Sequence, residues 1–271
     1  MKKRVTTALM LLAALLVLLV LPGVVMAAAV LLCIFIALKE EYQALKAAGN
    51  HPVAWPTWLG MVLSIPLAVL CGTKVLIPLM MGVFLVTIAC VMFSSAPRLE
   101  DALLSIMPGF TVAVPGMCVM AISLLQPKSL QLVLLALIIA TPCIGDMMAF
   151  FVGCRVRGPK LCPHVSPNKT ISGAIAGLVG SVLTALIIAL ITRLLVCPEN
   201  LPLMPTWWQF TLMGLFGGIA GQLGDLWASL VKRHCGIKDF SNLFPGHGGM
   251  LDRVDSILFM AMVVTCFRLM M

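Results

Sequence analysis

Residues 173–195 read GAIAGLVGSVLTALIIALITRLL, an apolar run with a single charge, Arg193, near its end. A helix needs roughly 20 apolar residues to cross a hydrocarbon core of about 30 Å, so this run predicts a transmembrane helix. Comparable runs lie within residues 2–22 and at about 23–38, 59–72, 74–93, 102–125, 130–152, 207–230 and 255–270. We therefore expect an all-α polytopic membrane protein with about nine transmembrane helices.

The composition agrees with a chain that lives in lipid. Hydrophobic residues make up 61% of it and charged residues only 10%, with a mean hydropathy of +1.11, which excludes a soluble globular domain. We expect one integral membrane domain over residues 1–271, with N-terminal helical hairpins at about 1–125 and catalytic helices and loops at about 130–271. The net charge of +8 is dispersed among the helices, which disfavours nucleic acid as a partner.

The first 29 residues have the features of a signal peptide, namely Lys2-Lys3-Arg4, an apolar run and Ala27-Ala28-Ala29. Apolar sequence nevertheless resumes directly after Pro22-Gly23 and continues to Leu38. We therefore prefer an uncleaved helical hairpin with its turn at Pro22-Gly23. The ten cysteines occur singly along the apolar runs, and we interpret them as small core residues, not as disulfide partners or zinc ligands.

The basic residues predict how the chain crosses the membrane. Lys and Arg are enriched in cytoplasmic loops, and with the N-terminus in the cytosol fourteen of the eighteen fall on the inner side. These are Lys2, Lys3, Arg4, Lys39, Lys46, Arg98, Arg155, Arg157, Lys160, Lys169, Lys232, Arg233, Lys238 and Arg253. The count predicts an outer C-terminus and places the two long polar connections, 153–172 and 231–254, in the cytosol.

Asp225 is the first candidate functional residue, because charged residues inside membrane spans are costly and usually functional. Helical spacing places Asp225, Ser229 and Lys232 on one face. A purely structural alternative is a local ion pair of Asp225 with Lys232 or Arg233. The glycines at 214, 217, 218, 221 and 224 form a small-residue stripe on the same helix, for which close helix packing is the default interpretation.

The stretch PGHGGMLDRVD, residues 245–255, adds a glycine turn and two carboxylates. A turn of this kind can offer backbone N–H groups to phosphate oxygens. Asp252 and Asp255 are three apart at the start of the last predicted helix, and with Asp225 they can coordinate Mg²⁺. Helix capping is the alternative for one of these residues. The whole set is typical of phosphoryl or nucleotidyl transfer.

A second polar block begins at Asp146, where Pro142 and Gly145 are able to open the helix and turn the carboxylate toward a cavity. It continues through Arg155, Arg157 and Lys160 to SPNKT at 166–170. Arg155 and Arg157 are equally well explained as ordinary cytosolic charges, whereas Lys169 is a candidate phosphate ligand. The sequence contains no P-loop, zinc-protease or serine-hydrolase motif.

Residues 229–255, SLVKRHCGIKDFSNLFPGHGGMLDRVD, resemble the signature of the phosphatidate cytidylyltransferases, or CDP-diglyceride synthases, at every fixed position. Residues 146–153 and KLCPHVSPNKT at 160–170 resemble the family's second segment. The resemblance implies that CTP and phosphatidic acid react to give CDP-diacylglycerol and pyrophosphate. Together with the charge count, we expect the reaction at the cytosolic face of a bacterial-type inner membrane. The resemblance also implies a homodimer and Mg²⁺, with K⁺ as a candidate second cation.

The resemblance implies a metal centre of Asp225, Asp252 and Asp255. The residues expected to carry the reaction are Asp225, Lys232, Arg233, Lys238, Asp239, His247, Asp252, Arg253 and Asp255. Those expected to bind substrate are Asp146, Lys160, Ser166, Lys169, Thr170, Ser229, Gly248 and Gly249. Where the family usually has an aromatic residue, Glu and Gly after SPNKT, this chain has Ile171, Ser172 and Gly173.

Two other functions stay open on the sequence. A CTP-dependent lipid kinase would use similar cations but transfer the γ-phosphoryl group to a lipid alcohol. An ion-coupled transporter or channel would use the intramembrane carboxylates along a pathway, although no internal repeat is visible and the charges gather at one boundary.

Overall fold

The computed structural model describes residues 13, 17, 19, 21, 23–156, 158–246 and 248–270. These residues form two compact units, and each unit is made of two separate stretches of the chain. The first unit contains residues up to 123 and the segment 231–253, and the second contains 124–230 and 254–271. Two of the three unit boundaries fall within helices, namely α9 (Trp207–His234) and α10 (Leu251–Leu269).

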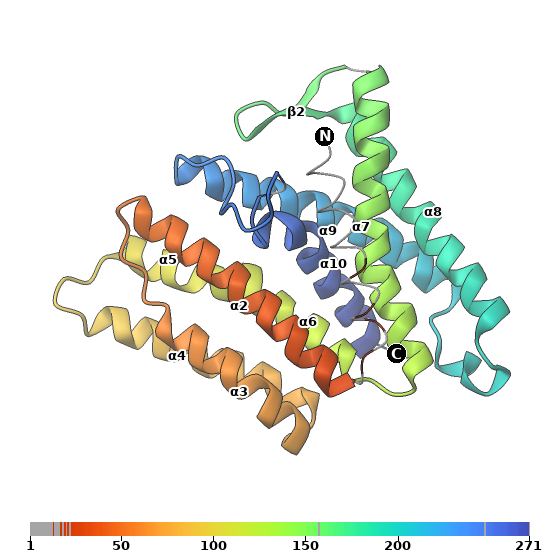
Figure 1. The fold of residues 1–271 in the computed structure, drawn as a ribbon, viewed down its shortest axis with the longest axis horizontal. Coiled ribbons are helices and arrows are strands. Elements are labelled where there is room, and N and C mark those ends of the chain that lie inside the picture. The colour runs from red at the N-terminus through yellow and green to blue at the C-terminus, as the bar shows by residue number, and fades with distance from the viewer. Residues whose placement is uncertain are drawn as a thin grey trace. The chain divides into compact units, whose positions relative to one another are not determined.

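Helices make up most of the first unit (Figure 1). Its elements are α2 (Gly23–Ala47), α3 (Trp55–Cys71), the 3-10 turn η1 (Thr73–Val75), α4 (Leu76–Met92), α5 (Leu99–Pro108), the π-helical turn η2 (Gly109–Ala113) and α6 (Val114–Ser123). Helix α2 packs against α3, α5 and α6, and α4 packs against α3 and α5. The end of α2 is fastened by Tyr42, whose hydroxyl lies 3.0 Å from Thr57 Oγ1 and donates to the Ser105 carbonyl at 2.9 Å.

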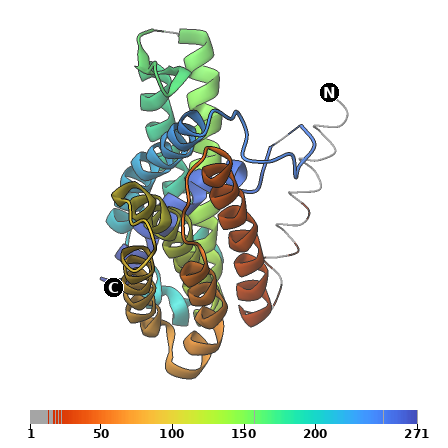
Figure 2. The same cartoon turned by 90° about the vertical axis from the view of Figure 1, so that its left-hand side faces the viewer.

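The second unit is built on α7 (Lys128–Val156) and α8 (Ile171–Leu195), which run side by side (Figures 1 and 2). In the sequence, α7 is joined to α8 by a short antiparallel hairpin of β1 (Lys160–Cys162) and β2 (Ser166–Thr170). Thr170 ends the hairpin and caps α8, because its hydroxyl accepts the Gly173 N–H at 3.1 Å. A 3-10 segment, η3 (Pro198–Leu203), leads from α8 to α9.

The glycine stripe of α9 permits close packing in the second unit, as the sequence predicts. A Cβ added at Gly214 or Gly218 would lie within 3 Å of atoms of α8, and one at Gly224 would lie 2.6 Å from the Asp255 carbonyl of α10. Only glycine allows backbones to approach this closely. The stripe therefore sets the spacing of α9 from two neighbouring helices.

Apolar runs and observed helices agree over the described residues. Each run predicted from residue 23 onward coincides with a helix, although the run at 102–125 is divided into α5, η2 and α6. Five helical segments within the described residues are long and apolar enough to cross a membrane, and α3 is a shorter apolar helix. The helix predicted within residues 2–22 falls almost entirely outside the described residues.

Two expectations are wrong. Pro142 and Gly145 do not open α7, which is continuous from Lys128 to Val156; Gly145 instead brings α7 close to α8, because an added Cβ would lie 2.5 Å from Ser181 Oγ. The cysteines are not core residues, since five are exposed and five are partly buried. A lipid-facing surface is itself apolar, so a small apolar residue gains little from burial inside the protein.

Candidate active site

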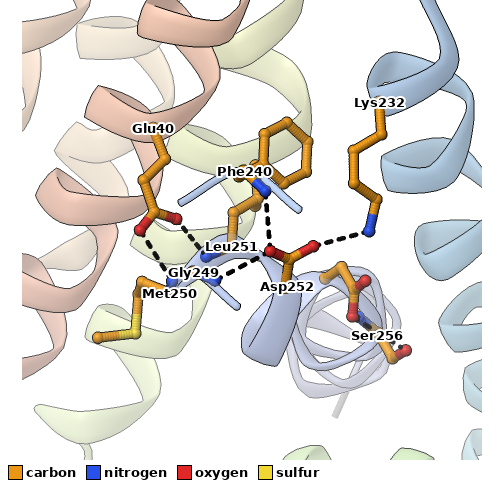
Figure 3. A network of polar contacts seen from close by, with 9 residues as sticks. Glu40, Lys232, Phe240, Gly249, Met250, Leu251, Asp252 and Ser256 are labelled. Atoms are coloured by element: carbon orange, nitrogen blue, oxygen red, sulfur yellow. Dashed lines mark hydrogen bonds and ion pairs between the residues drawn. The ribbon is translucent and has the colours of Figure 1, made fainter. Parts of the chain in front are cut away.

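Asp252 organises the loop between α9 and α10 in the first unit (Figure 3). Its Oδ1 accepts a hydrogen bond from Lys232 Nζ at 2.7 Å, and its Oδ2 accepts from the backbone N–H groups of Phe240 at 3.0 Å and Gly249 at 2.9 Å. The Asp252 side chain is only 3% exposed and that of Lys232 14%. A buried carboxylate with three donors, one of them a cation, stabilises both ends of the loop.

The glycine turn fits closely around this carboxylate. Gly246 and Gly248 have φ values of 78° and 80°, which side chains other than glycine rarely adopt. A Cβ on Gly248 would also lie 2.8 Å from Asp252 Oδ2, and one on Gly249 would lie 2.5 Å from Glu40 Oε2. The Phe244 N–H closes the turn on the Gly248 carbonyl at 2.9 Å. His247, predicted within this turn, lies outside the described residues.

Glu40 of α2 is a member of this network that the sequence analysis missed (Figure 3). Its Oε1 accepts from Ser241 Oγ at 2.6 Å and Met250 N–H at 2.9 Å, and its Oε2 accepts from Leu251 N–H at 2.8 Å. The sequence did contain a signal, because Glu40 and Glu41 are adjacent acids at the end of an apolar run, where charges are usually functional.

Asp225 pairs with Lys169 in the second unit. The partner is therefore on β2, and Lys232, one of the two local partners that the sequence left open, pairs with Asp252 instead. The side chains of Asp225 and Lys169 are 30% and 26% exposed. The predicted phosphate ligand and the predicted metal ligand are thus in contact with each other.

Two further carboxylates approach this pair within the second unit. Ser256 Oγ donates to Asp146 Oδ2 at 3.3 Å and lies 3.4 Å from Asp255 Oδ1, which also accepts the Ser256 N–H at 2.7 Å. Asp146 is also near enough to Asp225 and Lys169 for its charge to interact with theirs. Helices α7, α9 and α10 and strand β2 therefore bring together Asp146, Asp225, Asp255 and Lys169, each of which is 23 or more positions from the others in the sequence.

The remaining predicted residues lie on α9, the hairpin, the start of α8, the α9–α10 loop and α10. Ser229 is partly buried on α9, and Arg233 is exposed near the end of that helix. The hairpin holds Lys160, exposed, and Ser166, partly buried, while Thr170 is buried at the cap of α8. Exposed charges of the loop and of α10 are Lys238, Asp239 and Arg253. Ser172, at the family's Glu position, lies 3.2 Å from Thr170 Oγ1 through its hydroxyl oxygen.

The carboxylate oxygens of both networks are the donors that Mg²⁺ prefers. No group of three or more His, Cys, Asp or Glu side chains among the described residues is arranged to hold a metal ion. The Asp225 side chain is 30% exposed and that of Asp252 is 3% exposed. Oδ2 of Asp252 is held by two backbone N–H groups. Oδ1 of Asp252 accepts the hydrogen bond from Lys232 instead.

Comparison with known proteins identifies the family. A family model described as the cytidylyltransferase family matches residues 2–271. The chain belongs to that family. Among its relatives, the phosphatidate cytidylyltransferase of Synechocystis is 31% identical over 270 residues, which cover 88% of this chain and 86% of the relative. This membership confirms the resemblance seen in residues 229–255.

Other relatives match over a shorter region. The phosphatidate cytidylyltransferases of Brucella abortus and Bacillus subtilis are both 40% identical to this chain, over 122 and 114 residues. These matches cover 45% and 42% of this chain, and 42% and 39% of the relatives. The chain therefore spans less than half the length of these cytidylyltransferase relatives in alignment.

Proposed function

We propose that the protein is a phosphatidate cytidylyltransferase, which converts CTP and phosphatidic acid into CDP-diacylglycerol and pyrophosphate. The similarity to a relative of that name along 88% of the chain is the observation that carries the proposal. The site supports it as well, because two lysine–aspartate pairs, Lys169–Asp225 and Lys232–Asp252, form there. Lys169, Lys232 and Asp252 lie within the segments that resemble the family, and Asp225 lies four positions before one of them.

In the proposed reaction a phosphate oxygen of phosphatidic acid attacks the α-phosphorus of CTP in line. The new O–P bond forms as the bond between the α-phosphorus and the bridging oxygen breaks, and pyrophosphate leaves with that oxygen. No protein nucleophile is needed, so the protein's contribution is to position two anionic substrates and stabilise the charge. Lys169 and Lys232 bind phosphate oxygens, assisted by the exposed cations Arg233, Lys238 and Arg253.

Mg²⁺ is part of this proposal, with Asp225, Asp252 and Asp255 as its ligands and K⁺ as a candidate second cation. When bound, Mg²⁺ neutralises charge on the CTP phosphates. The lysine–aspartate pairs suit such a site, because an arriving phosphate attracts the lysine and leaves the carboxylate oxygen available. Asp146 is linked to Asp255 through Ser256, and this link positions the Asp255 carboxylate.

The membrane arrangement is proposed from the apolar runs and the charge count. The enzyme has about nine transmembrane helices, a cytosolic N-terminus and an outer C-terminus, and its site faces the cytosol of a bacterial-type inner membrane. CTP is supplied on that side, and phosphatidic acid arrives within the lipid leaflet. We also propose that the protein works as a homodimer.

The test is incubation of the purified protein with phosphatidic acid, Mg²⁺ and CTP labelled at its α- or γ-phosphate. We expect the α-label in CDP-diacylglycerol and the γ-label in pyrophosphate. Release of CDP with the γ-label on a lipid would instead identify a lipid kinase. Asp225→Asn should lower turnover at least about 100-fold, whereas Glu100→Gln, an exposed carboxylate of α5, should match the wild type; equal turnover in Asp225→Asn contradicts the proposed site.

A further inference from the structure

The carboxylate of Glu40 stabilises the start of α10 from a distant helix. It receives three hydrogen bonds, from Ser241 Oγ, Met250 N–H and Leu251 N–H, at 2.6, 2.9 and 2.8 Å. The Glu40 residue is 5% exposed. A charged carboxylate so deeply buried is tolerated only where donors surround it, and here the three come from the α9–α10 loop and the first residue of α10.

Two of these donors would otherwise be unsatisfied. The first N–H groups of a helix have no partner within the helix, and a side chain of the preceding residue usually accepts one of them. Helix α10 begins at Leu251, and the residue before it is Met250, whose side chain is a poor acceptor. Glu40 supplies the missing acceptor, and its negative charge suits the N-terminal end of the helix dipole.

The segment of α2 that carries Glu40 is firmly held in the first unit. Ala37, Leu38 and Leu45 are completely buried. Tyr42 lies two positions beyond Glu40 and bonds to α3 and α5 through Thr57 and Ser105. The backbone that carries the Glu40 carboxylate is therefore held in place by packing and by the hydrogen bonds of Tyr42.

The glycine turn and Asp252 depend on the same contact. Glu40 holds Met250 and Leu251, and Asp252, the next residue, holds Gly249 and Phe240 (Figure 3). Residues 249–251 are thus held by two carboxylates, Gly249 by Asp252 and the next two residues by Glu40. If Glu40 is removed, that segment loses the fixed start of α10 from which Asp252 projects.

We propose that Glu40 is a positioning residue for the site, fixing the glycine turn and the first turn of α10 so that Asp252 and Lys232 are in place for the substrates. This inference rests on the proposed cytidylyl transfer. Glu40 acts through the loop and does not contact substrate. The neighbouring Glu41 is a natural control, because it is buried on the same helix but is directed to Thr111, 3.5 Å from its hydroxyl.

The experiment compares Glu40→Gln with Glu41→Gln in detergent-solubilised full-length protein. Gln keeps one acceptor oxygen, but its NH₂ group is a donor and cannot accept the hydrogen bond that the second carboxylate oxygen accepts. Because a hydrogen bond to a charged group is strong, we expect hydrogen exchange in peptides covering 241–252 to speed up about 10- to 100-fold in Glu40→Gln. Exchange around Tyr42 and Ser105 should stay unchanged, and turnover should fall about 10-fold or more.

Several outcomes separate the possibilities. Unchanged exchange at 241–252 in Glu40→Gln, or an equal change in Glu41→Gln, overturns the proposal; faster exchange across α2, α3 and α5 also overturns it, because that shows a general structural role. If Glu40→Gln does not fold, Ser241→Ala removes one of the three bonds, and unchanged exchange there overturns the proposal. A wild type that makes no CDP-diacylglycerol refutes the proposed function, while the exchange result still decides whether Glu40 holds the loop.

Discussion

The pair of Lys232 and Asp252 allows a quantitative prediction about the stability of the first unit. Removing one partner of a buried ion pair typically costs about 3–5 kcal/mol. Lys232 retains 14% exposure, so we take about 3 kcal/mol for Asp252→Asn, the low end of that range. The Asn oxygen can still accept from Phe240 and Gly249, so the main effect is loss of the negative charge that pairs with Lys232. Lys232→Met keeps the length of the side chain and should cost a similar amount.

The double variant gives the sharper result. If the two side chains stabilise each other, the combined loss should be about 4 kcal/mol instead of 6, a coupling of about 2 kcal/mol. The measurement is unfolding of the four proteins by SDS titration in mixed micelles. Lys238→Met, which changes an exposed lysine of the same loop, should shift stability by less than about 0.5 kcal/mol. Single losses that add within about 0.5 kcal/mol would refute the reasoning.

Two further predictions concern glycines, each with a matched control. Gly248→Ala should destabilise the protein by about 2–3 kcal/mol in the same assay, because it combines a φ of 80° with a clash against Asp252. The control Gly236→Ala, at a φ of 68° with open space around it, should cost only about 1 kcal/mol. Equal losses of stability in the two variants would contradict this prediction. Gly224→Ala should cost about 3 kcal/mol of stability, more than Gly217→Ala. A Cβ at 224 meets the backbone carbonyl of Asp255, whereas a Cβ at 217 meets the flexible side chain of Met260. A larger loss for Gly217→Ala would show that the helix backbones move apart easily.

Much of the fold is predictable from the sequence because a membrane span imposes a long apolar run. Residues 173–195 predict α8 almost to the residue, and 74–93 and 130–152 likewise find α4 and α7. The β1–β2 hairpin within 153–172 was not expected. Its strands have three and five residues, too few for a clear alternating pattern, and their pairing depends on where α7 ends and α8 begins.

The candidate site shows the same division. The carboxylates and lysines stand out in the sequence as charges at the ends of apolar runs, and family membership supports their selection. Their partners do not stand out. Helical spacing favours a pair between Asp225 and Lys232, seven positions apart, yet Asp225 pairs with Lys169 and Lys232 pairs with Asp252, because packing of separate elements brings those groups closer.

The sequence alone determined that this chain is a helical membrane protein with its candidate site residues in two segments, since burial in lipid dictates composition residue by residue. Spacing along a helix also determined that Asp252 and Asp255 stand at the start of α10. Only the tertiary structure decided which groups meet across long separations, above all that Glu40 holds Met250 and Leu251, 210 and 211 positions away. The physical reason is that local spacing specifies neighbours within a turn or two, whereas a contact across the fold depends on how whole helices pack.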